Sequence, residues 1–328
     1  MRRRDFITLL GGAAAAPMLR PCAARAQQPA LPVVGYLNIA SPGGNPQFVA
    51  AFRQGLQDAG FVEGQNVAID FRFAEGRVER MPAMAAELVA RPVRVIVADT
   101  AGTPVARAAT STIPIVFLTP GDPVRAGFVA SFNRPGGNVT GVSFVNATVG
   151  SKRLELLREL VPGARTIALL MNPAFSTAEL DLQDMQAAVQ TMGLRVIVQR
   201  ASNDSEIDAA FASFARERPD ALLVLPDGYL TARRAQIVAL EARLAIPAMH
   251  SPRDWVVSGG LVSYGSNTSN SYRQGGVYAG RILKGEKPAD LPVVQPTKFE
   301  LVINLKAAKA FGLEVSPTLL AIADEVIE

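Results

Sequence analysis

Short apolar runs alternate with amphipathic segments along most of the chain, and this pattern predicts alternating strands and helices. In the first half, strands are predicted at Leu31–Leu37, Val67–Phe73, Val95–Ala98 and Ile115–Leu118. Helices are predicted between them at Gln47–Ala59, at Val78–Ala90 and from Pro104 onward. Such an alternation builds a parallel sheet with helices on both faces.

The second half of the chain repeats the same order of elements. Its predicted helices are Ser151–Leu160, Thr177–Met192, Asp204–Arg216 and Thr231–Leu244, and its predicted strands are Thr166–Met171, Leu194–Gln199, Leu222–Leu225 and Ile246–Met249. Strands in matching positions start about 130 residues apart, although residue identities do not repeat. We therefore expect two similar α/β lobes. The alternative is one large Rossmann-like sheet of about eight consecutive parallel strands.

Segments rich in glycine and proline separate these two patterns. Asn133–Ser143 contains Pro135-Gly136-Gly137 and predicts the first crossover, and Gly285–Pro296 predicts an extended connector. The tail predicts a strand at Phe299–Ile303, a helix at Leu305–Phe311 and a last amphipathic helix near Thr318–Ile327. We expect the first lobe to comprise residues 31–143 with about 251–290, and the second to comprise 144–250 with about 291–328.

The N-terminal stretch Met1–Ala26 has the features of an export signal peptide. Arginines at its start precede the apolar run Phe6–Met18, and Ala24-Arg25-Ala26 fits a cleavage site. The residues RRDFI at positions 3–7 resemble the twin-arginine export consensus, which predicts a periplasmic protein. An ordinary Sec signal is one alternative, and a lipoprotein attached through Cys22 is another.

Charge and residue usage exclude several classes of function. Removing the five arginines and one aspartate of the leader from 33 basic and 29 acidic residues leaves no net charge, so no nucleic-acid partner is expected. The remainder has one histidine and no cysteine, which excludes common zinc sites and a cysteine nucleophile. The chain contains no Gly-x-Ser-x-Gly elbow and no dinucleotide or P-loop signature. We therefore expect no cofactor, no metal and no enzyme activity.

Two loops that follow buried strands are candidates for ligand contact. Small and polar residues 99–103 follow one strand, and Pro104 then suits the first turn of a helix with Thr103 as its N-cap. In the second half, residues 226–229 occupy the same place. The N–H groups at a helix N-terminus suit a carboxylate or another anionic group, so Thr100, Gly102 and Thr103 either bind a ligand carboxylate or simply cap the helix. Two such loops facing each other would form a cleft for a small molecule.

Four stretches together resemble one family. These are GDPVRAGFVASF, PGGNVTGVS, SYRQGGVYAGRILKGEKPADLPV and FELVINLKAAKAFGL. From Leu31 to the C-terminus the chain is similar to substrate-binding proteins of ABC importers related to the tryptophan- and tyrosine-binding type. The resemblance implies a type I periplasmic-binding-protein fold, in which two Rossmann-like lobes with parallel sheets are joined by a three-strand hinge. It also implies delivery of the ligand to an ABC permease and ATPase, and we expect a monomer.

The resemblance places ligand contacts in the loops after the strands. The expected residues are Ser41, Thr100, Ala101, Gly102, Thr103, Thr119, Asp122, Asn172, Ser176, Thr177, Asp227, Tyr229 and Tyr264. Asp227 either receives a ligand ammonium or starts a turn, and Asp122 is a turn or helix cap by the alternative interpretation. Tyr229, Tyr264 and Trp255 are candidates for an aromatic wall, and the single histidine, His250, is interpreted as structural.

The main hypothesis is an extracytoplasmic solute-binding protein that closes its two lobes around a small organic solute, an amino acid or an aromatic acid. The first alternative is an exported hydrolase on the same scaffold, using Asp122 or Asp227. The second alternative is a sensor subunit that presents its closed form to a membrane receptor.

Overall fold

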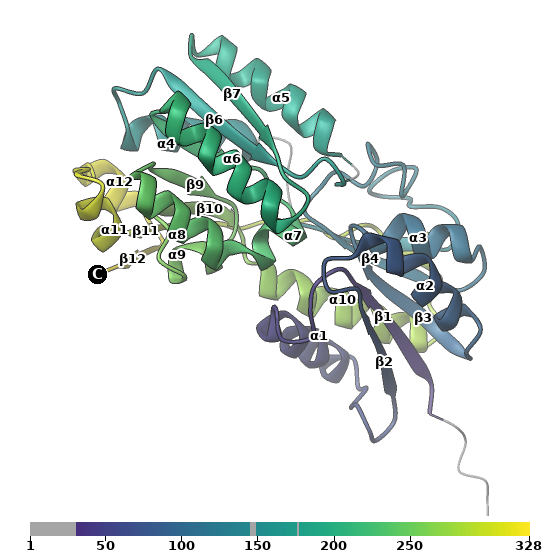
Figure 1. Cartoon of the computed structure of the whole chain (residues 1–328). Coiled ribbons are helices and arrows are strands. Elements are labelled where there is room, and N and C mark those ends of the chain that lie inside the picture. The colour runs from purple at the N-terminus through teal and green to yellow at the C-terminus, as the bar shows by residue number, and fades with distance from the viewer. Residues whose placement is uncertain (1–30, 145–148, 176) are drawn as a thin grey trace, which may run out of the picture. The chain divides into compact units, whose positions relative to one another are not determined.

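A computed structural model of the chain describes residues 31–144, 149–175 and 177–328 (Figure 1). Leu31–Glu328 forms one compact unit. The expected signal peptide at residues 1–26 and the expected contact residue Ser176 lie outside the described residues. Within the described part, no helix is long and apolar enough to cross a membrane.

The first half builds a five-stranded sheet, as the strand–helix alternation predicts. Its strands are β1 (Val33–Asn38), β2 (Ala68–Phe73), β3 (Val93–Asp99), β4 (Ile115–Thr119) and β5 (Val139–Ser143). Their order is β2-β1-β3-β4-β5, and all four pairings are parallel. The central strands are buried on both faces, which is why their sequences are continuous apolar runs rather than alternating ones.

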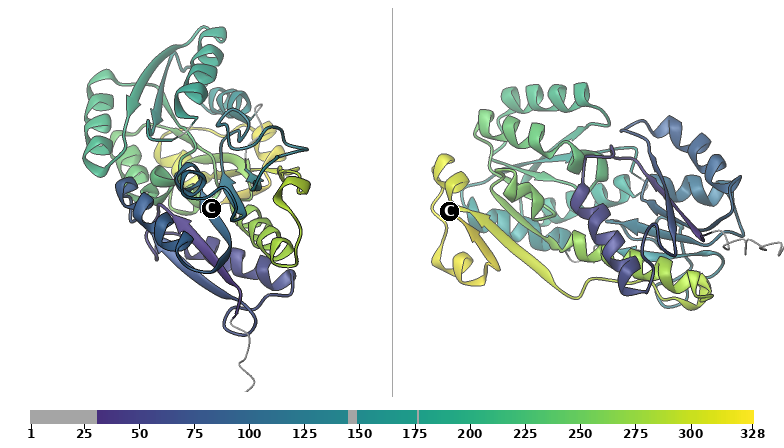
Figure 2. Two further views of the ribbon diagram at one scale, coloured as in Figure 1. Left: turned by 90° about the vertical axis from the view of Figure 1, so that its right-hand side faces the viewer. Right: turned by 90° about the horizontal axis from the view of Figure 1, so that it is seen from below.

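Helices cover both faces of this sheet. The helices α2 (Met81–Val89) and α3 (Gly102–Ala109) lie over one face, after the short 3-10 turn η1 (Val78–Arg80). The other face is covered by α1 (Pro46–Asp58) and by α10 (Thr268–Leu283), which comes from near the end of the chain and packs along α1 (Figure 2).

The helix α10 was not predicted, because its sequence is rich in glycine. Gly276 lies so close to α1 that a Cβ atom there would be 2.1 Å from the carbonyl oxygen of Phe52. A Cβ on Gly280 would be 2.3 Å from that of Ala59. These glycines weaken the helix locally but let the two backbones approach, so packing rather than propensity decides the conformation.

The second half builds a seven-stranded sheet in the order β12-β11-β10-β9-β8-β6-β7. Its strands are β6 (Thr166–Met171), β7 (Arg195–Arg200), β8 (Ala221–Val224), β9 (Ala248–His250), β10 (Val262–Ser266), β11 (Phe299–Asn304) and β12 (Glu325–Ile327). Five pairings are parallel, whereas β10 and β11 are antiparallel. The fold is therefore α/β with two lobes, and the single-sheet alternative is wrong.

Helices also cover both faces of the second sheet. They are α4 (Val149–Leu160), α5 (Ala178–Thr191), α6 (Asp204–Glu217), α7 (Gly228–Ala232), α8 (Arg234–Leu244), α9 (Asp254–Val257), α11 (Leu305–Ala310) and α12 (Pro317–Ile322). One buried core lies between the sheet and α4, α5, α11 and α12, and the other lies under α6 and α8. The short 3-10 turn η2 (Pro288–Asp290) interrupts the connector before β11.

Two expectations about the C-terminal third were wrong. The expected helix near 318–327 ends at Ile322, and Glu325–Ile327 instead pairs in parallel with β11 as the edge strand β12. The segment 251–266 was expected in the first lobe, but β10 belongs to the second sheet because it hydrogen-bonds to β9 and β11. Of the expected range 251–290, it is α10 that packs on the first sheet.

The chain passes between the two sheets three times. The first passage follows β5, the second lies between β10 and α10, and the third precedes β11. On the third passage Val294 still bridges to Val142 of β5, so the crossover falls after this residue.

Candidate functional site

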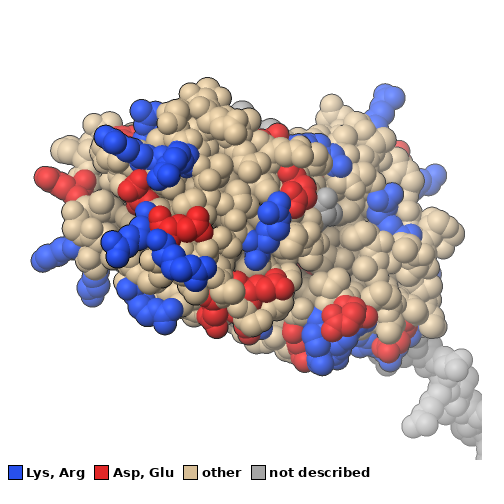
Figure 3. Space-filling model, turned by 45° about the horizontal axis from the view of Figure 1, so that its top comes forward, with Lys and Arg blue, Asp and Glu red and all other residues tan. Residues whose placement is uncertain are grey.

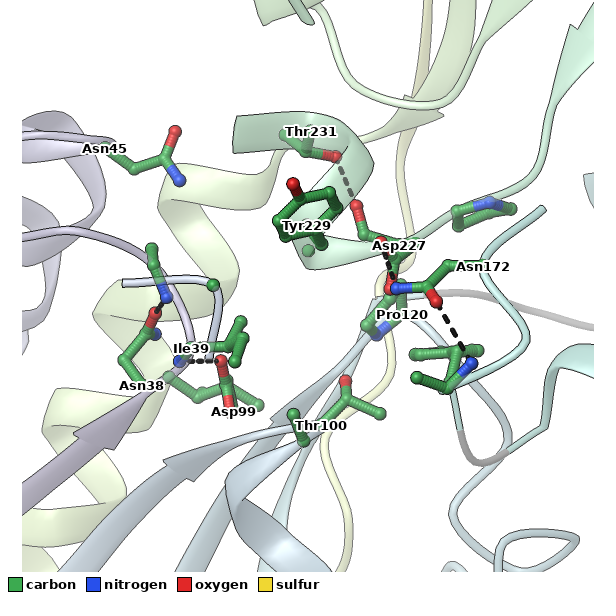
Figure 4. A pocket seen from close by; sticks show the side chains of 18 of the residues that line it. Asn38, Ile39, Asn45, Asp99, Thr100, Pro120, Asn172, Asp227, Tyr229 and Thr231 are labelled. Atoms are coloured by element: carbon green, nitrogen blue, oxygen red, sulfur yellow. Dashed lines mark hydrogen bonds between the residues drawn. The ribbon is translucent and has the colours of Figure 1, made fainter. Parts of the chain in front are cut away.

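A cavity of about 510 Å³ lies where loops from the two sheets meet (Figure 4). From the first sheet it is lined by residues that follow β1 and β3, and from the second by residues that follow β6 and β8. These are the carboxyl ends of parallel strands, where open α/β sheets bind ligands. The cavity therefore lies at the carboxyl ends of strands from both sheets.

One asparagine from each sheet lines this cavity at the end of a strand. Asn38 ends β1 and accepts a hydrogen bond from the backbone N–H of Ala40 at 2.8 Å. Asn172 follows β6 and accepts one from Ala174 at 3.0 Å. Both side chains are buried. Each thus forms a local turn that leads the chain away from the strand end.

One aspartate from each sheet also lines the cavity. Asp99 accepts hydrogen bonds from the N–H groups of Gly102 at 2.8 Å and Ile39 at 2.7 Å. Asp227 accepts hydrogen bonds from the N–H of Leu230 at 2.8 Å and the amide of Asn172 at 3.1 Å. Each carboxylate therefore satisfies the N-terminus of the following helix, α3 or α7.

This capping corrects the expected start of α3. The helix begins at Gly102, and Thr103 lies inside it, with its hydroxyl donating to the carbonyl oxygen of Asp99 at 2.7 Å. Thr103 is therefore not the N-cap. The same contact recurs in the second half, where the Thr231 hydroxyl donates to the carbonyl of Asp227 at 2.7 Å.

Burial perturbs the pKa of both aspartates at the cavity. Burial raises the pKa of Asp99 to about 6, and the charge of Asp227 also raises this pKa. The hydrogen bonds from Ile39 and Gly102 lower it and so oppose the shift. Burial also raises the pKa of Asp227, and its hydrogen bonds oppose that shift. Two desolvated carboxylates therefore flank the same space.

An aromatic group forms the apolar part of the lining. Tyr272 of α10 stacks on Phe48 of α1 with ring centroids 4.8 Å apart, and Phe144 lies 5.8 Å from Tyr272. Burial raises the pKa of the Tyr272 phenol, so it stays protonated at neutral pH. Phe175 lines the cavity from the second sheet.

The predicted aromatic wall is only partly present. Tyr229 lines the cavity, but its hydroxyl donates to Asp204 at 2.5 Å. Trp255 stacks on His250 at 4.2 Å in the core of the second lobe, and neither lines the cavity. Tyr264 stacks on Phe299 at a centroid distance of 6.0 Å and also lies outside the lining. His250 is fully buried, as its structural interpretation requires.

Five of the expected contact residues line the cavity, namely Thr100, Ala101, Asn172, Asp227 and Tyr229. The described residues that do not line it are Ser41, Gly102, Thr103, Thr119, Asp122, Thr177 and Tyr264. Thr119 lies one step behind, because Thr100 donates to its hydroxyl at 3.0 Å. Asp122 accepts from the N–H of Val124 at 2.8 Å, which is the capping role of the alternative interpretation. The Thr177 hydroxyl donates to Asp181 at 2.6 Å.

The sequence interpretation missed lining residues such as Asn38, Phe48, Asp99, Phe144 and Tyr272. Asp99 opens the candidate loop 99–103 but was not among the expected contact residues. Like Asp227, it accepts a hydrogen bond from the N–H three residues later, so the repeat of the two loops could have identified it. Tyr272 lies on α10, and no local pattern indicates that this helix packs beside the first sheet. No cluster of potential metal ligands occurs among the described residues.

Two α/β lobes with a cavity at the carboxyl ends of both sheets define a type I periplasmic-binding-protein fold. Residues 35–327 match the family model described as ABC transporter substrate binding protein, and the chain belongs to this family. The family consists of substrate-binding proteins rather than enzymes. Its members bind small solutes, work with permease and ATPase components, and generally act outside the cytoplasm.

Individual relatives agree with this assignment. The chain is 29% identical over 266 residues to a tyrosine-binding protein of Clostridioides difficile, covering 80% of this chain and 76% of that protein. A solved ABC domain in complex with L-Trp from Streptococcus pneumonia is 27% identical, with a TM-score of 0.84 and coverage of 90% of this chain and 100% of that one. A conserved domain protein from Vibrio cholerae is 25% identical, with a TM-score of 0.84 and coverage of 90% and 99%.

Proposed function

We propose that this protein captures a small organic solute of the amino-acid or aromatic-acid class in the cavity between its lobes and delivers it for import. The observation that carries this proposal is the cavity itself, which is lined from both sheets by polar groups at strand ends and by aromatic side chains. The tyrosine-binding and L-Trp-bound relatives support an aromatic solute. A mainly apolar pocket with a few placed polar groups is the usual form of a small-molecule site.

Contacts between the lobes support a closed arrangement. Arg234 of α8 donates to the side chain of Asn45, at the start of α1, at 3.1 Å. On another side of the boundary, Arg125 forms an ion pair with Asp184 of α5. Such contacts form only when the lobes approach each other. A ligand that contacts both lobes binds the closed state better than the open one, so it shifts the equilibrium toward closure. The permease then recognises the closed surface.

The test combines calorimetry with small-angle scattering on the purified protein. Titration with the amino acids and with aromatic acids should give one ligand that binds tightly, and that ligand should reduce the radius of gyration. Tight binding without compaction would contradict closure. No heat with any of these compounds would remove the assignment of solute class.

We further propose that the chain is exported to the periplasm through the twin-arginine route and acts as a monomer. The support for export is the leader sequence, with Arg3 and Arg4 before its apolar run. Changing both arginines to lysine should abolish export by this route. Continued export of the double variant would indicate the Sec pathway instead.

Light scattering tests the proposed monomer. The purified protein should have a mass near the 34.8 kDa of the chain, less the cleaved leader.

A further inference from the structure

We propose that Asp99 and Asp227 select a ligand by its ammonium group, and that a ligand carboxylate is dispensable for recognition. This inference rests on the proposed function and narrows the solute to amine-bearing aromatic compounds. It excludes aromatic acids that lack an amine.

The two aspartates are equivalent residues of the two lobes. Asp99 is the last residue of β3, and Asp227 follows β8, the third strand of the second lobe. Each accepts a hydrogen bond from the N–H three residues later, and each has a threonine four residues later that donates to its carbonyl oxygen. Figure 4 shows Asp99 and Asp227 on either side of the cavity. Closure therefore brings one buried carboxylate from each lobe to the same ligand.

The helix N-termini at the cavity are already occupied by these carboxylates. The N–H of Gly102 is bonded to Asp99, and the N–H of Leu230 is bonded to Asp227. A ligand carboxylate placed there would have to displace or approach an aspartate of like charge. The expectation that Thr100, Gly102 and Thr103 bind a ligand carboxylate is thus disfavoured, because the protein supplies its own anion at this helix end. The Thr100 hydroxyl, which lines the cavity, already donates to Thr119.

The described lining offers no buried cation to balance the pair. Its charged members besides the two aspartates are Arg77 and Glu79. The Arg77 side chain is 57% exposed and already pairs with Glu75 at 3.2 Å. The buried charge of the cavity is therefore negative, and an organic cation with an aromatic body matches both this charge and the stacked rings of Phe48 and Tyr272.

Charged side chains of both signs are mixed on the surface outside the cavity. On the face shown in Figure 3, basic and acidic side chains are interspersed. Salt screens the interaction of a ligand with exposed surface charges, whereas it screens charges inside the cavity much less. The selection must therefore come from the two buried carboxylates.

Two matched series test the inference by calorimetry. The first is tryptophan, tryptamine and indole-3-propionate, and the second is tyrosine, tyramine and 3-(4-hydroxyphenyl)propionate. In the series that binds, the amine should bind at least as tightly as the amino acid, and the acid should show no binding. An acid that binds as tightly as its amine, or an amino acid that binds when its amine does not, would overturn the inference.

Failure of the inference and failure of the proposed function are distinguishable. If no member of either series binds but another amino acid or aromatic acid does, the aromatic-amine assignment is wrong and the solute-binding function stands. If nothing in the broader titration binds, the proposed solute class fails as well.

A variant separates charge from shape. Asp227→Asn keeps an N-cap of equal quality for α7, so it should fold. It should weaken binding of the amine by about tenfold or more, because a charged partner is lost. Binding of the neutral analogue indole-3-ethanol or 4-hydroxyphenylethanol should stay within about threefold of wild type.

The control variant Asp122→Asn changes a carboxylate outside the cavity and should leave both affinities unchanged. Equal loss for the amine and its neutral analogue in Asp227→Asn would show a structural role instead.

Discussion

The buried carboxyl group of Asp99 should make the stability of this protein depend on pH in an unusual direction. Its pKa is raised from 3.8 to about 6 by burial, against hydrogen bonds that lower it. A group with a raised pKa in the folded state binds a proton more tightly when folded than when unfolded. Its stabilising contribution is complete below the unfolded value and is lost as the pH rises through about 6.

The size of this effect follows from the shift. The pKa differs between the two states by about two units, and one unit corresponds to about 1.4 kcal/mol, so the full effect is about 3 kcal/mol. Most of it, about 2–3 kcal/mol, should appear between about pH 4 and pH 7. Other groups titrate in this range, so the contribution of Asp99 has to be isolated by comparison with a variant.

The variant is Asp99→Asn, which removes the titration but keeps the shape of the side chain. Asparagine retains one acceptor for the N–H groups of Ile39 and Gly102 and turns a donor toward the other, which should cost about 1–3 kcal/mol at every pH. Urea unfolding of both proteins across this range gives the difference in free energy of unfolding. That difference, wild type minus variant, should fall by about 2–3 kcal/mol as the pH rises.

Two results would refute this reasoning. A difference that stays constant with pH would mean that the Asp99 carboxyl has its ordinary pKa and is not desolvated. A difference that increases with pH would mean that the two backbone N–H groups outweigh burial and hold its pKa below the ordinary value. Asp122→Asn serves as the control, since this carboxyl is partly exposed and caps a turn.

Two further predictions concern packing and closure. Gly276→Ala should destabilise the protein by about 3 kcal/mol or more in thermal unfolding, because the new Cβ would lie 2.1 Å from a backbone oxygen of α1, whereas Gly163→Ala, which has open space, should be near neutral. A wild-type-like melting temperature for Gly276→Ala would disprove the close helix contact. Arg125→Ala should weaken ligand binding by no more than about fivefold, because its ion pair with Asp184 is partly exposed to solvent. Raised salt should weaken ligand binding to wild type but not to this variant. A larger loss that is independent of salt would show that Arg125 contacts the ligand itself.

The sequence alone determined most of the local structure. Apolar runs such as Thr166–Met171 became strands with the predicted bounds, because a strand buried on both faces needs apolar residues at every position. The repeat of strands and helices predicted two lobes and placed a cleft at the strand ends. Asp227 and Asn172 were found among the candidate residues for the same reason, since each follows a buried strand.

What the sequence left undecided depends on partners that are distant along the chain. β12 is a strand because β11 offers it an edge, although its own residues read as the end of a helix. α10 packs closely on α1 because Gly276 and Gly280 of α10, and Gly55 of α1, lack the Cβ atoms that would keep the backbones apart. Tyr272 lines the cavity because α10 packs beside the first sheet. Local patterns indicate which residues prefer to be buried, but the tertiary structure decides which surfaces bury them. Only that choice adds Phe48 of α1 and Tyr272 of α10 to the cavity beside the two loops.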